Sequence, residues 1–147
     1  MEIVEITEYS DDFLEAINAL LPQLSPTSKP LREEDLKKII KSNCAKLFFA
    51  VENKQSLGTL TLVMFKIPTG TRAWIEDIVV DRKSRGRGIG KRLIKHVIQL
   101  AKQSGAITVD LTSHPSRKTA NALYKKAGFK TRATNVYRYK ISQLKEL

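Results

Sequence analysis

The sequence predicts an α/β fold in a single domain over residues 1–147, with a β-sheet flanked by about four helices. Two observations predict it, and the cysteine count adds a third point about the fold. Short runs rich in β-branched and aromatic residues alternate with segments whose apolar residues recur at helical spacing. The 147 residues, 41% hydrophobic and 28% charged, have the size and composition of one globular unit. The single cysteine, Cys44, leaves no internal disulfide to organise the fold, and we expect it to pack as a small apolar side chain.

The first part of the chain should form a strand followed by two helices. Residues 1–7 alternate between apolar and polar side chains, which suits a short edge strand. Ser10 or Asp11 can cap the helix that follows, and Pro22 should end it. The second helix should begin with Pro30 in its first turn, where a backbone N–H has no helical partner to lose.

Three strands should follow these helices. Residues 46–51 and 57–67 flank a turn-prone stretch, so they predict a β-hairpin. Residues 72–80 predict another long strand. Regular alternation along this strand would point Asp77 to one face and four other side chains to the opposite face, namely Trp74, Glu76, Ile78 and Val80.

A helix and a strand are expected after the loop that ends this strand. The loop covers residues 81–90, and the helix that it opens should close near Gly105. Residues 107–111 then predict a strand.

The end of the chain predicts a last helix and a closing hairpin. Ser116 can cap a helix that runs through Lys126, and Gly128 suits its C-terminal end. Residues 129–131 and 136–141 have strand composition and suggest the two arms of a hairpin.

Charge is distributed unevenly along the chain. Residues 1–65 carry 7 Lys or Arg and 10 Asp or Glu, whereas residues 66–147 carry 19 and 5. The second half should therefore attract an anionic partner. A solvated basic face or nucleic-acid binding would account for the same excess of positive charge. The local sequence motifs therefore have to distinguish between these explanations.

Three alternating glycines, Gly86, Gly88 and Gly90, stand where the long strand gives way to a helix. Backbone without side chains lets N–H groups converge at the positive end of the helix dipole, which favours a phosphorylated ligand. A Walker loop does not fit, because Lys91 is followed by Arg92, which has no hydroxyl for magnesium. The single-residue spacing also departs from the dinucleotide fingerprint G-x-G-x-x-G.

Two motifs resemble those of the GCN5-related N-acetyltransferases (GNAT). In WIEDIVVDRKSRGRGIGKRL, the R-x-x-G-x-G pattern of the family's acetyl-CoA-binding motif is matched by Arg85, Gly88 and Gly90. In SRKTANALYKKAGF, the A-x-x-x-Y-x-x-x-G-F pattern is matched by Ala120, Tyr124, Gly128 and Phe129. The resemblance implies a mixed sheet that is splayed into a V at its fourth strand, the acyl-CoA N-acyltransferase type of fold.

The resemblance also implies how acetyl-CoA would bind. The pantetheine would lie in the V, paired with the backbone of Ile78 and Val80, and backbone N–H groups of the glycine loop would wrap the pyrophosphate. Arg117 stands where relatives often place an asparagine that touches the cofactor. The expected cofactor-binding residues are therefore Ile78, Val79, Val80, Arg85, Gly86, Arg87, Gly88, Ile89, Gly90, Lys91 and Arg117.

Glu76 and Tyr124 are the expected catalytic residues. A primary amine with a pKa near 10.4 is protonated at neutral pH, so it needs a base before it can attack a thioester. Relatives with a Glu-Asp pair on this strand use the Glu, which is Glu76 here; the alternative is that Glu76 only pairs with an arginine. The resemblance assigns the proton donor for the departing thiolate to Tyr124, whose alternative role is that of a core aromatic.

The prediction is an acetyl-CoA-dependent N-acetyltransferase whose acceptor amine attacks the thioester directly. The acceptor is a primary amine of a small molecule or a protein amino group, and residues 134–138 are a candidate border of its pocket. No metal and no membrane are expected, nucleic acid is not the expected partner, and the protein should be cytoplasmic and could form a homodimer. The alternatives are a basic nucleic-acid-binding module and a non-catalytic acyl-CoA sensor.

Overall fold

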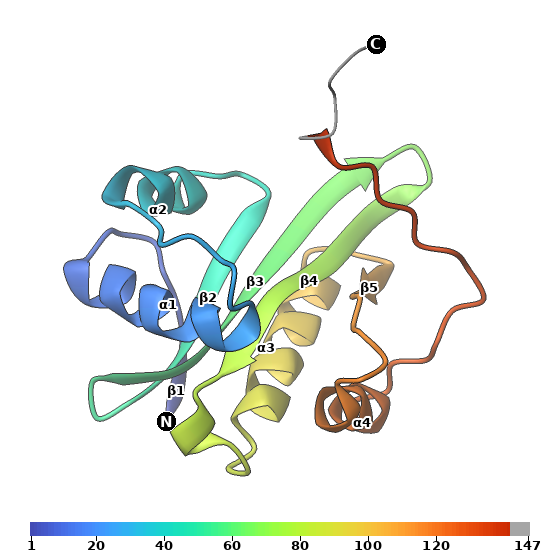
Figure 1. The fold of residues 1–147 in the computed structure, drawn as a ribbon. Coiled ribbons are helices and arrows are strands. Elements are labelled where there is room, and N and C mark those ends of the chain that lie inside the picture. The colour runs from blue at the N-terminus through green and yellow to red at the C-terminus, as the bar shows by residue number, and fades with distance from the viewer. Residues whose placement is uncertain (142–147) are drawn as a thin grey trace.

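The computed structural model describes residues 1–141. Its strands form one sheet in the order β1-β2-β3-β4-β5, antiparallel except for the parallel pair β4 and β5 (Figure 1). The elements are β1 Glu2–Glu5, α1 Asp11–Leu24, α2 Glu33–Ile40, β2 Ala45–Glu52, β3 Gln55–Ile67, β4 Gly70–Val80, the 3₁₀ helix η1 Arg82–Ser84, α3 Ile89–Gln103, β5 Thr108–Asp110 and α4 Lys118–Lys126.

The sheet separates two apolar cores, because alternate side chains of each strand point to opposite faces. In β2, Leu47 and Phe49 pack with α1 and α2, whereas Phe48 and Ala50 pack with α3. Figure 1 shows the same arrangement, with α1 and α2 on one face and α3 on the other. The predicted hairpin of β2 and β3 is confirmed, and its tight turn places Asn53 in the left-handed conformation at φ 49°.

A bulge interrupts β4 and corrects the predicted alternation. Asp77 has φ 48°, and the register against β3 slips at this level. As a result, Ile78 and Val80 pack against the α3 core and Val79 enters the core on the α1 side. The prediction that Glu76 shares a face with Ile78 and Val80 is therefore wrong, because one extra residue reverses the alternation.

The sheet opens between β4 and β5, as the V-shaped fold requires. Only Arg72, Ala73 and Trp74 pair with β5, at Thr108, Val109 and Asp110. Beyond Trp74, the edge of β4 that faces away from β3 has no strand neighbour within residues 1–141. The fold class predicted from the sequence, a mixed sheet splayed at its fourth strand, is confirmed.

The first two helices begin and end differently from the prediction. Pro22 lies inside α1, and the helix continues because Ser25 N still donates to Leu21 O at 2.9 Å. Asn18 holds Leu31 in an extended conformation, since Leu31 N donates to Asn18 Oδ1 and Asn18 Nδ2 donates to Leu31 O. Helix α2 therefore starts at Glu33 rather than at the turn of Pro30.

Two further expectations about local structure are wrong. Cys44 is exposed, because it lies in the turn before β2, where its N–H group bonds to Ser42 Oγ. Helix α4 begins at Lys118 with Arg117 as its N-cap residue, and Ser116 Oγ instead lies 2.7 Å from His114 Nδ1.

The closing hairpin does not form in the part of the chain that the structure describes. Residues 129–140 contain no strand, and Tyr137 and Tyr139 are 86% and 68% exposed. Strand-like composition shows that a segment is able to form a strand, but a strand also needs a neighbouring strand to pair with. The last strand before this segment, β5, is only three residues long.

Candidate active site

The glycine loop connects β4 to α3 and is shaped by its capping contacts. Asp81 accepts a hydrogen bond from Lys83 N at 3.1 Å, which caps the short 3₁₀ helix η1. Gly86 and Gly88 then adopt left-handed backbone conformations, at φ 80° and 75°, and Gly88 is the N-cap residue of α3. Glycine reaches these angles without the steric cost that other residues meet, which explains the residue type at both positions.

The loop presents free backbone donors at the positive end of α3. The first helical hydrogen bond runs from Arg92 N to Gly88 O, so the N–H groups of residues 86–91 have no acceptor among residues 1–141. A Cβ atom added at Gly86 or Gly88 would meet nothing within 4 Å, so the space above the backbone is open. Free N–H groups, open space and a helix N-terminus together fit a pyrophosphate.

Gly90 has a packing role in addition. A Cβ atom there would come within 3.0 Å of Leu123 Cδ2, so this glycine allows α3 and α4 to approach each other closely. Ile89 is buried beside it, whereas Lys91 is exposed at the start of the helix.

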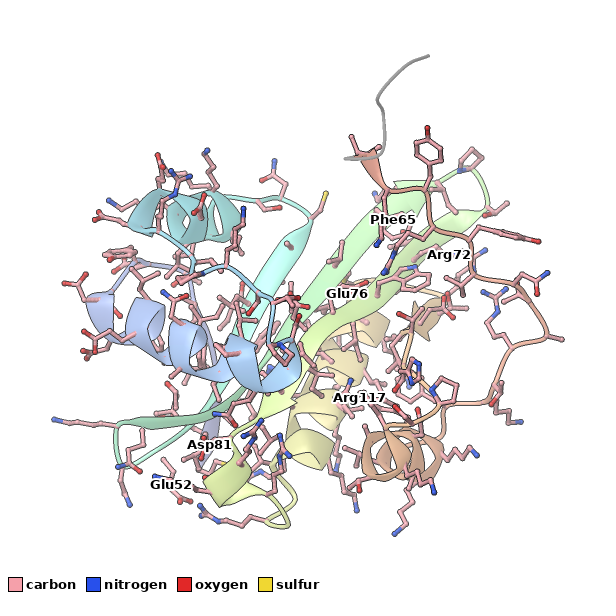
Figure 2. The ribbon with its side chains drawn as sticks, in the orientation of Figure 1. Glu52, Phe65, Arg72, Glu76, Asp81 and Arg117 are labelled. Carbon is pink, nitrogen blue, oxygen red and sulfur yellow. The ribbon has the colours of Figure 1, made fainter. Side chains whose placement is uncertain are left out.

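The two arginines of the loop make contacts within the protein. Arg85 Nε donates to Val80 O at 3.2 Å, which ties the loop back to the end of β4. Arg87 forms an ion pair with Glu52 in the β2–β3 hairpin, and this hydrogen bond lowers the pKa of Glu52. Each guanidinium uses one nitrogen in these contacts and keeps further N–H donors, so both the backbone and the arginine side chains of the loop offer donors. Figure 2 shows Glu52 and Asp81 on this side of the molecule.

Glu76 lies on β4, next to the bulge and opposite Thr61 of β3. Figure 2 shows it near the middle of the strand. The pKa of this carboxyl is raised, first by the partial burial of the group and then by the charge of Asp77, whereas Arg138 acts in the opposite direction. Within residues 1–141 Glu76 forms no ion pair.

Tyr124 lies on α4 and is only 5% exposed. Its ring packs in the α3 core and meets Phe129 edge to face at 6.1 Å. Burial raises the pKa of its hydroxyl, and the neighbouring Arg117 guanidinium lowers it. The pKa of Tyr124 is raised overall, because burial outweighs the opposing effect of Arg117.

A groove of about 1120 Å³ lies between β5, α4 and the segment that follows α4. Trp74, Asp110 and Tyr124 contribute to its lining, and Thr134 and Val136 line it from the C-terminal segment. Two residues of the predicted border at 134–138, Thr134 and Val136, therefore line this groove.

Two contacts of the site and one effect of charge had no signal in the sequence. Gln23 bonds to Asp81, Glu52 pairs with Arg87, and Arg138 acts on Glu76. The partners are 58, 35 and 62 residues apart in the numbering. No local pattern connects such positions; only the folded topology does.

Two findings bear on the predicted partners. None of the helices in the described part of the chain is long and apolar enough to cross a membrane. Likewise, residues 1–141 bring together no three His, Cys, Asp or Glu side chains that could hold a metal ion. That the reaction needs no metal stays a prediction.

Comparison with known proteins identifies the family. The model of the Acetyltransferase (GNAT) family matches residues 10–129. Glucosamine 6-phosphate N-acetyltransferase 1 of Oryza sativa subsp. japonica is 30% identical over 136 residues, which are 86% of this chain and 78% of that protein. N-alpha-acetyltransferase MAK3 of Arabidopsis thaliana is 35% identical over 92 residues, which are 63% of this chain. The chain spans 48% of MAK3, and 31% and 44% of two other curated N-acetyltransferases that it matches.

A solved structure agrees in fold. An aminoglycoside acetyltransferase from an uncultured soil metagenomic sample, determined in complex with sisomicin, has a TM-score of 0.83. The superposition covers 95% of this chain and 94% of the other, at 21% sequence identity. The family model covers most of the sequence and the splayed sheet has the matching fold, so this chain belongs to the GNAT family of acetyltransferases.

Proposed function

We propose that the protein transfers the acetyl group of acetyl-CoA to a primary amine, by direct attack of the amine on the thioester. One observation carries the proposal: the free N–H groups of residues 86–91 follow directly on the unpaired edge of β4. A phosphate site that follows directly on an unpaired strand edge suits a ligand that has a pyrophosphate at one end and amide groups along its length. Coenzyme A is such a ligand.

Each part of the site has a task in binding acetyl-CoA, which supplies the activated acetyl thioester. The N–H groups of residues 86–91 would hold the pyrophosphate. The backbone of residues 78–80 would pair with the pantetheine amides along the edge that β5 leaves open. The positive charge of the second half of the chain would draw the anionic cofactor towards the loop.

The reaction needs proton transfers at the amine nitrogen and at the leaving thiolate. Glu76 accepts a proton from the ammonium form of the acceptor, directly or through water, and its raised pKa makes it a better base than an ordinary carboxylate. The amine nitrogen then forms a bond to the acetyl carbon, and the C–S bond breaks with its electron pair on sulfur. Tyr124 donates its hydroxyl proton to that thiolate, the acetylated nitrogen loses its second proton to solvent, and the Tyr124 phenolate regains a proton from solvent.

The acceptor belongs to the wide class of primary amines. The relatives named above are described as acting on glucosamine 6-phosphate, on protein α-amino groups and on aminoglycosides. We propose a small amine or a protein amino group for this chain as well, with the groove beside Trp74 and Val136 as the place where it enters. Action in the cytoplasm, without a metal and as a monomer or homodimer, is part of the same proposal.

A panel of acceptors tests the proposal. Purified protein is mixed with acetyl-CoA and glucosamine 6-phosphate, a peptide with a free N-terminus, an aminoglycoside or a polyamine. We expect thiol release together with a product one acetyl group heavier for at least one amine, and Tyr124→Phe serves as the control with weakened chemistry. A rise in melting temperature with acetyl-CoA but no product would favour the acyl-CoA sensor. Displacement of acetyl-CoA by duplex DNA would favour the nucleic-acid-binding module.

A further inference from the structure

Strand β4 carries a row of three chemically different side chains on the face of the sheet opposite α3. Ala73 and Ile75 point into the α3 core. Because side chains alternate along a strand, Arg72, Trp74 and Glu76 point to the other face. The bulge in β4 begins beyond this row, so the alternation is regular here. Figure 2 shows Arg72 and Glu76 along this stretch of the strand. A cation, an aromatic ring and a carboxylate therefore follow one another on one face.

The spacing of this row sets the size of a ligand that could contact all of it. Arg72 and Glu76 are four residues apart on a regular strand, so their Cα atoms are about 13 Å apart. Trp74 lies between them, is half-buried and lines the groove. An amine that reacts at Glu76 and reaches Arg72 would therefore lie across the indole ring, which offers it apolar surface.

Arg72 is held in place by hydroxyl groups. Its Nη2 donates to Thr69 Oγ1 at 3.2 Å, and its Nη1 donates to Thr108 Oγ1 at 3.4 Å. Thr108 Oγ1 donates in turn to Asp110 Oδ2 at 3.2 Å. The guanidinium is thus oriented by neutral groups of the β3–β4 turn and of β5, and it keeps further N–H donors for a ligand.

The charges around Arg72 do not balance. Asp110 is the nearest carboxylate in this network, but its Oδ1 already lies 4.0 Å from Arg132 Nη1. In the part of the chain that the structure describes, the half-buried Arg72 has no carboxylate partner. A partly buried cation without a counter-ion favours the binding of an anionic group, because the ligand then supplies the missing charge.

We propose that Arg72 is a specificity-determining residue that binds an anionic group, a phosphate or a carboxylate, of a small acceptor amine. The inference rests on the acetyl transfer proposed above and narrows its acceptor to amines with a negative charge at a distance from the reacting nitrogen. The nitrogen would lie at Glu76, the carbon skeleton across Trp74 and the anionic group at Arg72. A chain of about six carbon atoms, with a hydrogen bond at each end, spans a distance of this order.

A series of three amines tests the proposal. 6-Aminohexyl phosphate, 6-aminohexanoate and 6-aminohexanol share one carbon chain and differ in the charge at its far end. With acetyl-CoA as donor, we expect kcat/KM for at least one anionic amine to exceed that for the alcohol by roughly 10-fold, through a lower KM. A preference for the phosphate, for the carboxylate or for both identifies the anionic group that is recognised. Equal values of kcat/KM for all three amines would overturn the proposal.

Two substitutions assign the preference to a residue. Arg72→Gln should lose most of the preference, whereas Arg72→Lys should keep part of it. Lys66→Gln is the matched control: Phe65 lies opposite Arg72 in the register, so the next residue, Lys66, is an exposed cation that points to the other face. A preference that survives in Arg72→Gln, or that Lys66→Gln reduces equally, would overturn the role of Arg72 and indicate diffuse attraction by the basic surface.

Calorimetry separates the failure of this site from the failure of the proposed function. The three amines are titrated into the parent protein and into Arg72→Gln, each saturated with coenzyme A. Tighter binding of an anionic amine to the parent than to Arg72→Gln, without any acetylated product, would support the anion site and contradict the proposed acetyl transfer. Acetylation of all three amines with equal efficiency would support acetyl transfer and overturn the anion site.

Discussion

Gln23, in the last turn of α1, donates from Nε2 to Asp81 Oδ1 at 2.9 Å, and its Oε1 accepts from Arg82 N at 2.9 Å. One amide side chain therefore joins α1 to the start of the glycine loop. Asp81 caps η1 in turn, so the contact helps to hold the loop that is proposed to bind the pyrophosphate.

Replacement of Gln23 should loosen this loop. Gln23→Ala leaves Arg82 N without its acceptor and Asp81 Oδ1 without the Gln23 donor, so we expect a loss of about 1 kcal/mol in the free energy of unfolding. The affinity for acetyl-CoA should fall by a few-fold, because the loop must then be ordered on binding. Urea unfolding and calorimetry measure the two effects. Gln103→Ala, which truncates an exposed glutamine at the end of α3, is the matched control. Equal effects of the two substitutions would mean that the contact with Asp81 is unimportant.

Gly88 and Gly105 provide a test of the phosphate site with an internal control. Both have a positive φ, 75° and 80°, and both face open space, but they flank opposite ends of α3. Substitution by Ala should cost each about 1–2 kcal/mol of stability, because the left-handed conformation is unfavourable for a residue with a Cβ atom. Only Gly88→Ala places that atom where the pyrophosphate is proposed to lie, so only it should weaken acetyl-CoA binding strongly, by roughly 10-fold or more.

Isothermal titration calorimetry and thermal unfolding of the two glycine variants give the comparison. A similar loss of affinity in both would indicate that general destabilisation, or diffuse attraction by the basic half of the chain, governs binding.

The sequence was sufficient for those features of the site that depend on neighbouring residues. The glycine loop lies between β4 and α3 as predicted, because the order strand, glycines and amphipathic helix is local information. Tyr124 is likewise on the last helix, with Gly128 just beyond its end at φ 99°. Each of these predictions needed only periodicity and residues that favour a particular backbone conformation.

Features that depend on distant partners could not be predicted. The bulge at Asp77 reverses the face of Ile78 and Val80, and an Asp residue gives no sign of it in a run of strand-forming residues. Tyr137 and Tyr139 have strand composition, yet whether they pair depends on a neighbour that composition does not reveal. The contact of Arg87 with Glu52 depends on side-chain directions that only the fold sets.

Replacement of Glu76 by Gln should have opposite effects on stability and activity: stability at pH 7 should not fall, whereas activity should. Folding raises the pKa of this carboxyl above 4.5, so the folded state binds its proton more tightly than the unfolded chain does. The contribution of Glu76 to stability therefore declines as the pH rises above about 4.5. We expect Glu76→Gln to be at least as stable as the parent at pH 7, and the difference to disappear below about pH 4.5.

The activity of Glu76→Gln should fall, because an amide cannot accept the proton of the amine. In the parent, kcat/KM should decline as the pH drops through the raised pKa of Glu76, and this acid limb should be missing in the variant. The deficit should shrink at high pH, where more of the amine is already neutral. A pH–rate profile and unfolding curves across the same range measure both effects. A deficit that does not depend on pH would make Glu76 a structural carboxylate.

Tyr124→Phe separates chemistry from packing at the remaining catalytic position. The ring stays in the α3 core beside Phe129, so the melting temperature should change little, and the cofactor contacts proposed for residues 86–91 are untouched. Removal of the hydroxyl deprives the thiolate of its proton donor, so kcat should fall by on the order of 10²–10⁴ while the affinity for acetyl-CoA is retained. Phe129→Leu, which alters the same aromatic contact and keeps the hydroxyl, is the control for packing. Turnover close to that of the parent in a well-folded Tyr124→Phe protein would leave Tyr124 as a core aromatic and transfer the role of acid to solvent.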